Sequence, residues 1–325
     1  MNMRYTAQEL LEAFMAERHA LGFIYKSGEC SIKRFLRDFK EPADGNTEFT
    51  KDYVLEHIHR QPNQSVNTVR RYVSAVNCFL NFAIRKGIRA YVIPVKVLPK
   101  EKKDFKARIF TDDEIARLLA AADSIPFIIQ NLDRIYQIPI MFRILINCGL
   151  RTAELLNLRM CDVDLNENAF TVLDTKFHKN RFVPFSNAVA DALKLYLSKV
   201  KPRHENDWLF RSPKTGDRYS GNMVNAFFRE ILRRAGIPHG GHGHGPRPHD
   251  LRHTFAVHCL NNWVLSDVDL TAALPVLSRY MGHSGINGTQ KYLQLTAEMY
   301  PDIVTRLEEK FGNLIPSMEV QHEAK

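Results

Sequence analysis

Residues 91–106, YVIPVKVLPKEKKDFK, interrupt a chain whose other regions carry regular apolar spacing. This segment has two prolines, five lysines and no helical period. Proline ends regular helices because it lacks an N–H group, so we expect an extended basic linker here. A chain of 325 residues is long enough for two domains. We therefore predict a domain at 1–90, a linker at 91–106, a second domain at 107–314 and a flexible tail at 315–325.

The first predicted domain carries the signals of four helices. Thr6 and Glu9 match a capping box, and apolar residues follow at helical spacing. Similar spacing recurs over residues 32–39, after Thr50 and over residues 66–86. No alternating strand pattern interrupts them, so we expect a helical domain.

The second predicted domain mixes two periodicities. It opens with a capping box at Thr111, in the sequence TDDE, and continues with helical spacing through residues 135–146. Residues 162–185 instead contain short β-type runs separated by turn residues, which predicts a small antiparallel sheet. Helical spacing returns over residues 188–200 and from Asp250 to about Leu314. The fold class predicted is mainly α, with a small antiparallel β-sheet in the C-terminal domain.

The charge balance favours a polyanionic partner. Forty-five Lys and Arg stand against 36 Asp and Glu, which leaves a net charge of +9. Nucleic acid is the usual partner of such a chain, although an ordinary basic protein would show the same balance. Arg70 and Arg71 lie on the predicted outer face of the helix at 66–86, where they either contact DNA or form a solvated face.

Cysteine and histidine patterns argue against disulfides and metal. The five cysteines are widely spaced without a CxxC motif, and no apolar run is long enough for a membrane span, so we expect a cytoplasmic protein. His239, His242 and His244 lie in HGGHGHG and could in principle bind a metal. A glycine-rich loop holds no fixed ligand geometry, so we favour a flexible loop near DNA and predict no metal or cofactor.

The segment PHDLRH concentrates positive groups. His249, Arg252 and His253 are spaced i, i+3, i+4 and share one helix face, so we expect a negative group opposite them. Three other segments carry candidate chemistry. They are CGLRTAELLNLR with Arg151 and Glu154, TKFHKNRFVP with Lys176, and MGHSGINGTQKYLQL with His283 and Tyr292.

In this order within one domain, the four segments resemble the tyrosine recombinases, also called phage integrases. The resemblance covers nearly the whole chain, and HxxRH followed by GH and Tyr carries most of it. It implies an N-terminal four-helix SAM-like core-binding domain and a DNA breaking-rejoining catalytic domain. The catalytic residues it implies are Arg151, Lys176, His249, Arg252, His283 and, as the nucleophile, Tyr292.

These residue types suit metal-independent attack on a phosphodiester. Arginine forks match phosphate geometry, and histidines donate hydrogen bonds and exchange protons near neutral pH. His249 is our candidate base for Tyr292, Lys176 our candidate acid for the leaving oxygen, and Lys179 the rival acid. Glu154 is expected to position Arg151, and His253 to be a packing residue that supports the site without acting in the reaction. The expected DNA-binding residues are Arg70, Arg71, Lys100, Lys102, Lys103, Lys179 and Arg181.

By resemblance, Tyr292 forms a 3′-phosphotyrosine link, which a 5′ hydroxyl of another strand then attacks, without ATP or metal. The expected partner is double-stranded DNA with a specific core site, bound by a homotetramer. Extra residues at 263–271 favour integration or excision of a mobile element over a housekeeping role. Two alternatives are a catalytically silent DNA-binding accessory protein and a type IB topoisomerase. A helix expected near 301–312 either docks on a neighbouring subunit or packs on its own domain.

Overall fold

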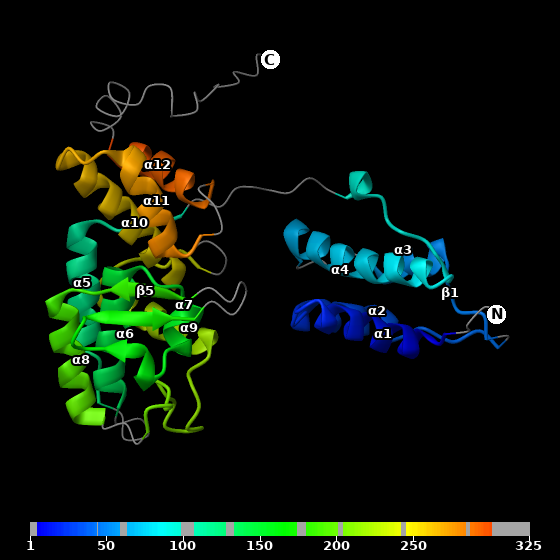
Figure 1. The fold of residues 1–325 in the computed structure, drawn as a ribbon, viewed down its shortest axis with the longest axis horizontal. Coiled ribbons are helices and arrows are strands. Elements are labelled where there is room, and N and C mark those ends of the chain that lie inside the picture. The colour runs from blue at the N-terminus through cyan, green and yellow to red at the C-terminus, as the bar shows by residue number, and fades with distance from the viewer. Residues whose placement is uncertain are drawn as a thin grey trace, which may run out of the picture. The chain divides into compact units, whose positions relative to one another are not determined.

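The computed structural model forms two compact units, Met1–Phe105 and Lys106–Lys325 (Figure 1). It describes residues 5–300 except Asp44 and residues 59–63, 99–106, 128–132, 174–179, 201–203, 242–244 and 284–286. The tail predicted at 315–325 and the helix expected near 301–312 lie outside the described residues.

The described part of the first unit is built from four helices and one pair of two-residue strands. Thr6 and Glu9 form the predicted capping box, and Thr50 and Ser65 cap two further helices. Strands β1 and β2 pair in parallel, and aromatic rings such as Phe14 and Phe79 fill the core. The elements are α1 (Ala7–Ala20), α2 (Lys26–Leu36), β1 (Glu48–Phe49), α3 (Lys51–His57), α4 (Val66–Arg85) and β2 (Arg89–Ala90).

The segment predicted to be a linker begins as part of the first unit. The Tyr91 amide donates to the Phe49 carbonyl, and Ile93 is 4% exposed. The Asn77 side chain bonds both backbone groups of Ile93, over 2.9 and 3.1 Å. The extended segment can therefore pack here because the Asn77 side chain forms the hydrogen bonds that a neighbouring strand would otherwise provide. Tyr91 and Ile93 thus pack on the first unit, while Lys100, Lys102 and Lys103 lie outside the described residues.

The second unit is mainly helical, with a three-stranded antiparallel sheet ordered β3-β4-β5. The predicted fold class is confirmed, and the capping box at Thr111 is present. Helix α9 was not predicted, although Ser220 caps it and its buried residues repeat at helical spacing. The elements are α5 (Asp112–Asp123), α6 (Arg134–Cys148), α7 (Thr152–Asn157), β3 (Val163–Asp164), β4 (Ala169–Val172), β5 (Arg181–Pro184), α8 (Asn187–Val200), α9 (Gly221–Arg234), α10 (Pro248–Leu265), α11 (Leu270–Met281) and α12 (Asn287–Met299).

Two hydrophobic clusters divide the second unit. The larger one joins α5, α6, α8, α9 and the sheet, while the smaller one lies between α10, α11 and α12 (Figure 1). Helix α10 also packs against α6. The residues at 263–271 complete the last turn of α10 and form the turn that leads into α11. No helix among the described residues is long and apolar enough to cross a lipid bilayer.

The segment around Phe110, which enters the second unit, forms hydrogen bonds with side chains of α10. The Phe110 amide donates to Thr254 Oγ1 over 3.1 Å, and His258 Nε2 donates to the Phe110 carbonyl over 3.0 Å. Thr254 and His258 lie one helical turn apart, so α10 satisfies both backbone groups of Phe110.

We expect Thr254→Val to lower the free energy of unfolding by about 1–3 kcal/mol, because it leaves the buried Phe110 amide without its acceptor. Trp208 and Trp263 are the only tryptophans and both lie in the second unit, so urea unfolding followed by their fluorescence measures the effect. Thr254→Ser keeps the hydroxyl and should lose less. Equal losses in the two variants would contradict this assignment.

Candidate active site

Two helices of the second unit end beside each other, where arginines bind their last carbonyl groups. Helix α6 ends at Gly149 and α11 at Gly282, both in the left-handed conformation. Arg252 donates to the Gly149 carbonyl over 2.8 Å and also to that of Met281. Arg151 donates to the Gly282 carbonyl over 2.8 Å. Helix C-termini carry partial negative charge, so they stabilise these guanidinium groups.

Gly149 has a second reason to be glycine. A Cβ atom at this position would lie 2.4 Å from the Phe255 ring. Only glycine therefore lets α6 end this close to α10, the helix that carries Arg252. That close approach brings Arg252 within reach of the Gly149 carbonyl.

Arg252 is the most deeply buried cation of the site, with 2% of its surface exposed. Burial and the nearby charge of Arg151 lower its pKa to about 10, so it stays protonated at neutral pH. Its nearest carboxylate is Glu154, 3.8 Å away. A buried guanidinium held mainly by carbonyl groups keeps most of its positive charge uncompensated, which suits an anionic ligand.

Glu154 is the carboxylate that three arginines of this cluster share. Its carboxylate accepts from the Arg151 backbone amide over 2.8 Å and from Arg151 Nη1 over 2.6 Å, which fits the predicted positioning role. Burial opposes ionisation of Glu154, but hydrogen bonds from Arg181 and Arg151 outweigh it and lower the pKa. Three arginines surround this single carboxylate, so the cluster retains an excess of positive charge.

Arg181 lies in this cluster rather than on the surface. Its guanidinium forms a fork on Glu154, over 3.0 and 2.9 Å, and its side chain is 10% exposed. The predicted contact with the DNA backbone does not fit this position, because the group is covered and bound by protein atoms. The partners of Arg181 are 27 and 99 residues away along the chain, so local sequence patterns could not place it.

Tyr292 lies against the arginines and two histidines. It is 3% exposed, and its hydroxyl interacts with the Arg252 guanidinium. The centroid of its ring is 5.8 Å from that of His283 and 5.5 Å from that of His253. His253 was predicted to be a packing residue that supports the site, and its ring lies against that of Tyr292. The His249 ring lies edge-on to the His253 ring, with centroids 4.8 Å apart, and His249 is exposed. Its role as the base for Tyr292 stays a prediction.

The hydrogen bonds of His283 define its tautomer. Arg252 Nη2 lies 3.3 Å from His283 Nε2, and Thr289 Oγ1 lies 2.9 Å from its Nδ1. A guanidinium only donates, so Nε2 accepts and Nδ1 carries the proton. Burial and the arginine charges lower the pKa of His283 to about 4, in agreement with a neutral ring.

Tyr292 is not activated in this arrangement. Burial raises its pKa, and the nearby Arg252 and Arg151 only partly offset this effect. A nucleophilic tyrosine here therefore needs a group that accepts its proton.

The sequence pattern of the phage integrase family matches residues 108–299, which include every one of these side chains. The chain belongs to the phage integrase family. A putative integrase/recombinase of Sinorhizobium fredii is 28% identical over 94% of this chain and 98% of its own. A protein of Listeria monocytogenes named tyrosine recombinase XerD is 26% identical over 91% and 96% of the two chains.

Solved structures share the fold of this family member. The XerH site-specific recombinase bound to its difH substrate matches with a TM-score of 0.60, 18% identity and coverage of 94% of this chain and 84% of that one. The Tn1549 transposon integrase bound to transposon right end DNA matches with a TM-score of 0.62, 16% identity and coverage of 93% and 99%.

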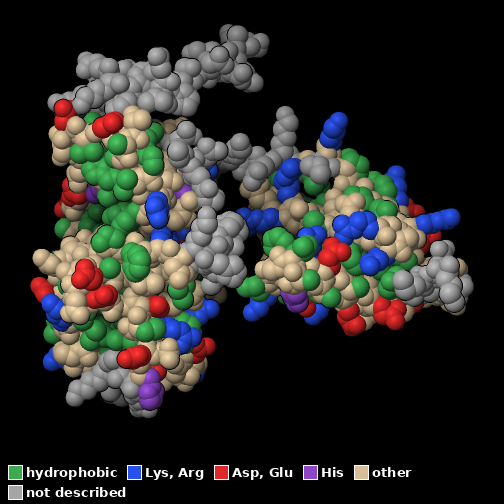
Figure 2. Space-filling model, viewed as in Figure 1, with side chains coloured by type: hydrophobic (Ala, Val, Ile, Leu, Met, Phe, Trp, Pro, Cys, Tyr) green, Lys and Arg blue, Asp and Glu red, His purple; other side chains and the backbone are tan. Residues whose placement is uncertain are grey.

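Other predicted site residues either lie elsewhere in the chain or are outside the described residues. Lys176 and Lys179 lie outside the described residues. Arg70 and Arg71 lie on α4 in the first unit, whose visible face carries several Lys and Arg side chains (Figure 2). His242 and His244 are also undescribed, and no group of three or more potential metal ligands occurs among the described residues.

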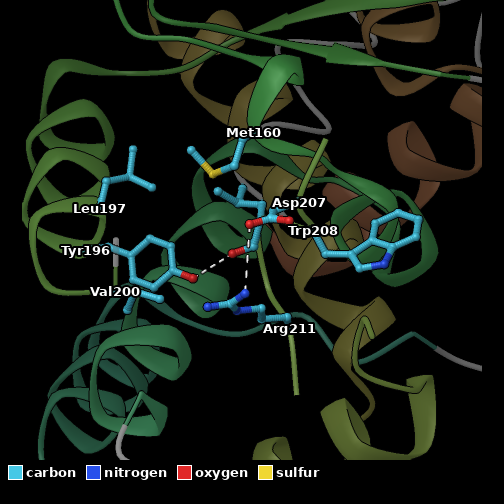
Figure 3. A pocket seen from close by; sticks show the side chains of 8 residues that line it. Met160, Tyr196, Leu197, Val200, Asp207, Trp208 and Arg211 are labelled. Atoms are coloured by element: carbon cyan, nitrogen blue, oxygen red, sulfur yellow. Dashed lines mark hydrogen bonds and ion pairs between the residues drawn. The ribbon is translucent and has the colours of Figure 1, made fainter. Parts of the chain in front are cut away.

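A small hollow elsewhere in the second unit is a poor candidate for an active site (Figure 3). The Tyr196 hydroxyl donates to the Leu209 carbonyl over 2.6 Å, and Arg211 lies 3.8 Å from Asp207. These polar groups pair with one another, and no predicted site residue lines the hollow. The lining residues are Met160, Tyr196, Leu197, Val200, Asp207, Trp208, Leu209 and Arg211.

We expect acid to destabilise this protein through His253 and His283. Burial, with nearby charges, lowers the pKa of both to about 4 from an ordinary value of 6.5. Between pH 6.5 and 4 the unfolded chain therefore binds protons that the folded chain does not, so stability falls as pH falls. Urea midpoints measured at pH 7 and 4.5 should differ less for the double variant His253→Gln/His283→Gln. An unchanged pH dependence in that variant would contradict the histidine assignment.

Proposed function

We propose that this protein is a site-specific DNA recombinase that cuts and rejoins strands through a 3′-phosphotyrosine intermediate. The observation that carries the proposal is the Tyr292 hydroxyl beside Arg252, within a cluster that has more arginine than carboxylate charge. A purely DNA-binding protein has no use for a tyrosine buried against such a cluster. A scissile phosphate placed there would supply the missing negative charge.

The proposed reaction exchanges one phosphoester for another. The Tyr292 oxygen attacks phosphorus, the bond from phosphorus to the 5′ oxygen breaks, and the tyrosine proton passes to a base, for which His249 is our candidate. A general acid, Lys176 or its rival Lys179, protonates the leaving 5′ oxygen. Attack by a 5′ hydroxyl of another strand reverses these steps. Because the ester is conserved, the reaction needs no ATP, and the arginines supply the positive charge that a metal would otherwise provide.

The proposed partner is double-stranded DNA with a specific core site, bound by a homotetramer in the synapse. Two structures with the same fold, those of XerH and the Tn1549 integrase, were solved with DNA. The net charge of +9 and the basic residues Arg70, Arg71, Lys100, Lys102, Lys103 and Lys179 support contact with the DNA backbone.

Integration or excision of a mobile element is the biological role we propose. The residues at 263–271, which end α10 and lead into α11, support it, as does the likeness to an integrase of the transposon Tn1549. The alternatives remain a silent DNA-binding accessory protein and a type IB topoisomerase. Relaxation of a supercoiled plasmid of arbitrary sequence would favour the topoisomerase.

A covalent protein–DNA adduct tests the proposed function. The purified protein is mixed with nicked fragments of the DNA that flanks its gene, and products that survive SDS are resolved beside those of Tyr292→Phe. Wild type should form an adduct and the variant none. An adduct with both would mean that another residue is the nucleophile. Tight specific binding without any adduct would favour the silent DNA-binding protein.

A further inference from the structure

Arg181 joins three elements of the site through one guanidinium group. It is the first residue of β5, and its Nη1 and Nη2 donate to the two oxygens of Glu154 on α7 over 3.0 and 2.9 Å. Its Nε donates to the Tyr280 carbonyl in the last turn of α11 over 2.8 Å. All three nitrogens of the group are therefore bound by protein atoms.

The fork of Arg181 on Glu154 also determines where Arg151 lies. The oxygens that accept from Arg181 are the same ones that accept from Arg151, through its Nη1 over 2.6 Å and its backbone amide over 2.8 Å. A bidentate pair fixes the plane of the carboxylate. Fixing that plane fixes the direction of the Arg151 guanidinium, which is 36% exposed and therefore accessible to a ligand.

The Arg181 guanidinium also packs against the turn that precedes His283. Gly282 packs so closely on the guanidinium that a Cβ atom there would lie 2.9 Å from Arg181 Nη1. The Gly282 carbonyl is also an acceptor for Arg151 Nη2. Arg181 thus contacts both the carboxylate and the turn on which Arg151 depends.

We propose that Arg181 is a positioning residue that holds Arg151 and the Gly282–His283 turn in the arrangement that binds the scissile phosphate. This inference rests on the proposed recombinase function. It assigns Arg181 to the reaction step rather than to DNA affinity, because all three of its nitrogens already bind protein atoms and its side chain is covered.

The test compares Arg181→Gln and Arg181→Lys with Arg143→Gln. Arg143 is a matched control, because it forms the same kind of fork on Asp123, over 2.6 and 2.7 Å, and contacts none of the site residues named above. The rate of adduct formation is measured in a single turnover at saturating nicked DNA, alongside the DNA dissociation constant at several salt concentrations.

We expect Arg181→Gln to lower the rate at saturation by about 10- to 100-fold, since small misplacements of reacting groups cost up to about 100-fold. Arg181→Lys keeps the charge but not the fork, so its rate should be intermediate. Dissociation constants and their salt dependence should match wild type. Arg143→Gln should cleave at the wild-type rate.

The pH profile separates positioning from general support of the fold. Without Arg181, the carboxylate of Glu154 loses its main hydrogen-bond donor, so its pKa rises. Cleavage by Arg181→Gln should therefore fail at a higher pH than cleavage by wild type as the pH is lowered. Arg143→Gln should not move this limit.

Two results of these measurements would overturn the inference. One is a wild-type rate in Arg181→Gln. The other is weaker DNA binding, with a salt slope smaller by about one and an unchanged rate at saturation, which would make Arg181 a phosphate contact. An inactive wild type would instead contradict the proposed function. Hydrogen exchange then tests the positioning role separately. The amides of residues 281–283 should exchange faster in Arg181→Gln but not in Arg143→Gln. Unchanged exchange in Arg181→Gln would overturn the inference.

Discussion

Arg151→Ala is expected to slow strand cleavage by about 100- to 1000-fold, equivalent to about 3–4 kcal/mol of transition-state stabilisation. Arg151 is the cation of the cluster with the largest exposed fraction among the three that surround Glu154, so its donors can reach a phosphate oxygen. DNA binding should change much less, because many other cations contribute to it. Single-turnover adduct formation at saturating DNA measures the loss.

A positive charge at position 151 should not be enough to restore strand cleavage. Arg151→Lys keeps a positive group but cannot hold Glu154 and the Gly282 carbonyl with one fork, so it should remain far below wild type. Arg159→Ala is the control, because that arginine contacts Asn206 and Trp208 instead. Wild-type cleavage by Arg151→Ala would remove Arg151 from the reaction.

Glu154→Ala is expected to cause the largest loss of stability, about 3–5 kcal/mol, because it leaves neighbouring guanidinium groups without their shared carboxylate. Arg181 and Arg252 are both nearly buried, so water cannot replace the lost charge. Urea unfolding followed by tryptophan fluorescence measures the free energy of unfolding.

A surface ion pair gives the matching control. Asp113 pairs with Arg117 one helical turn away, and both side chains are well exposed, so Asp113→Ala should cost less than about 1 kcal/mol. A similarly small loss in Glu154→Ala would mean that the arginines do not depend on this carboxylate.

Local signals predicted most helices of this protein. The capping boxes at Thr6 and Thr111 each satisfy two backbone or side-chain donors within four residues, so a short stretch of sequence contains the whole interaction. The sheet was also foreseeable from its short β-type runs. Helix α9 carries equivalent signals in Ser220 and its apolar spacing, and these could have revealed it.

The remaining features depend on contacts between distant residues. Asn77 holds the segment around Ile93 on the first unit, although two prolines predict a linker there. The resemblance indicated that Arg151, Arg252, His283 and Tyr292 belong together, but not that His253 would contact the Tyr292 ring. Arg181 was predicted to contact the DNA backbone. Its partner atoms on α7 and α11 become visible only in the folded chain.

The most direct test of the account is to identify the bond between protein and DNA. Adducts are formed with nicked DNA labelled either upstream or downstream of the cut, digested with protease and analysed by peptide mass. We predict that the modified peptide contains Tyr292 and retains only the upstream strand, which is linked through its 3′ phosphate, while the downstream strand leaves with a 5′ hydroxyl. A modified residue other than Tyr292, or a link through a 5′ phosphate, would contradict the proposed function.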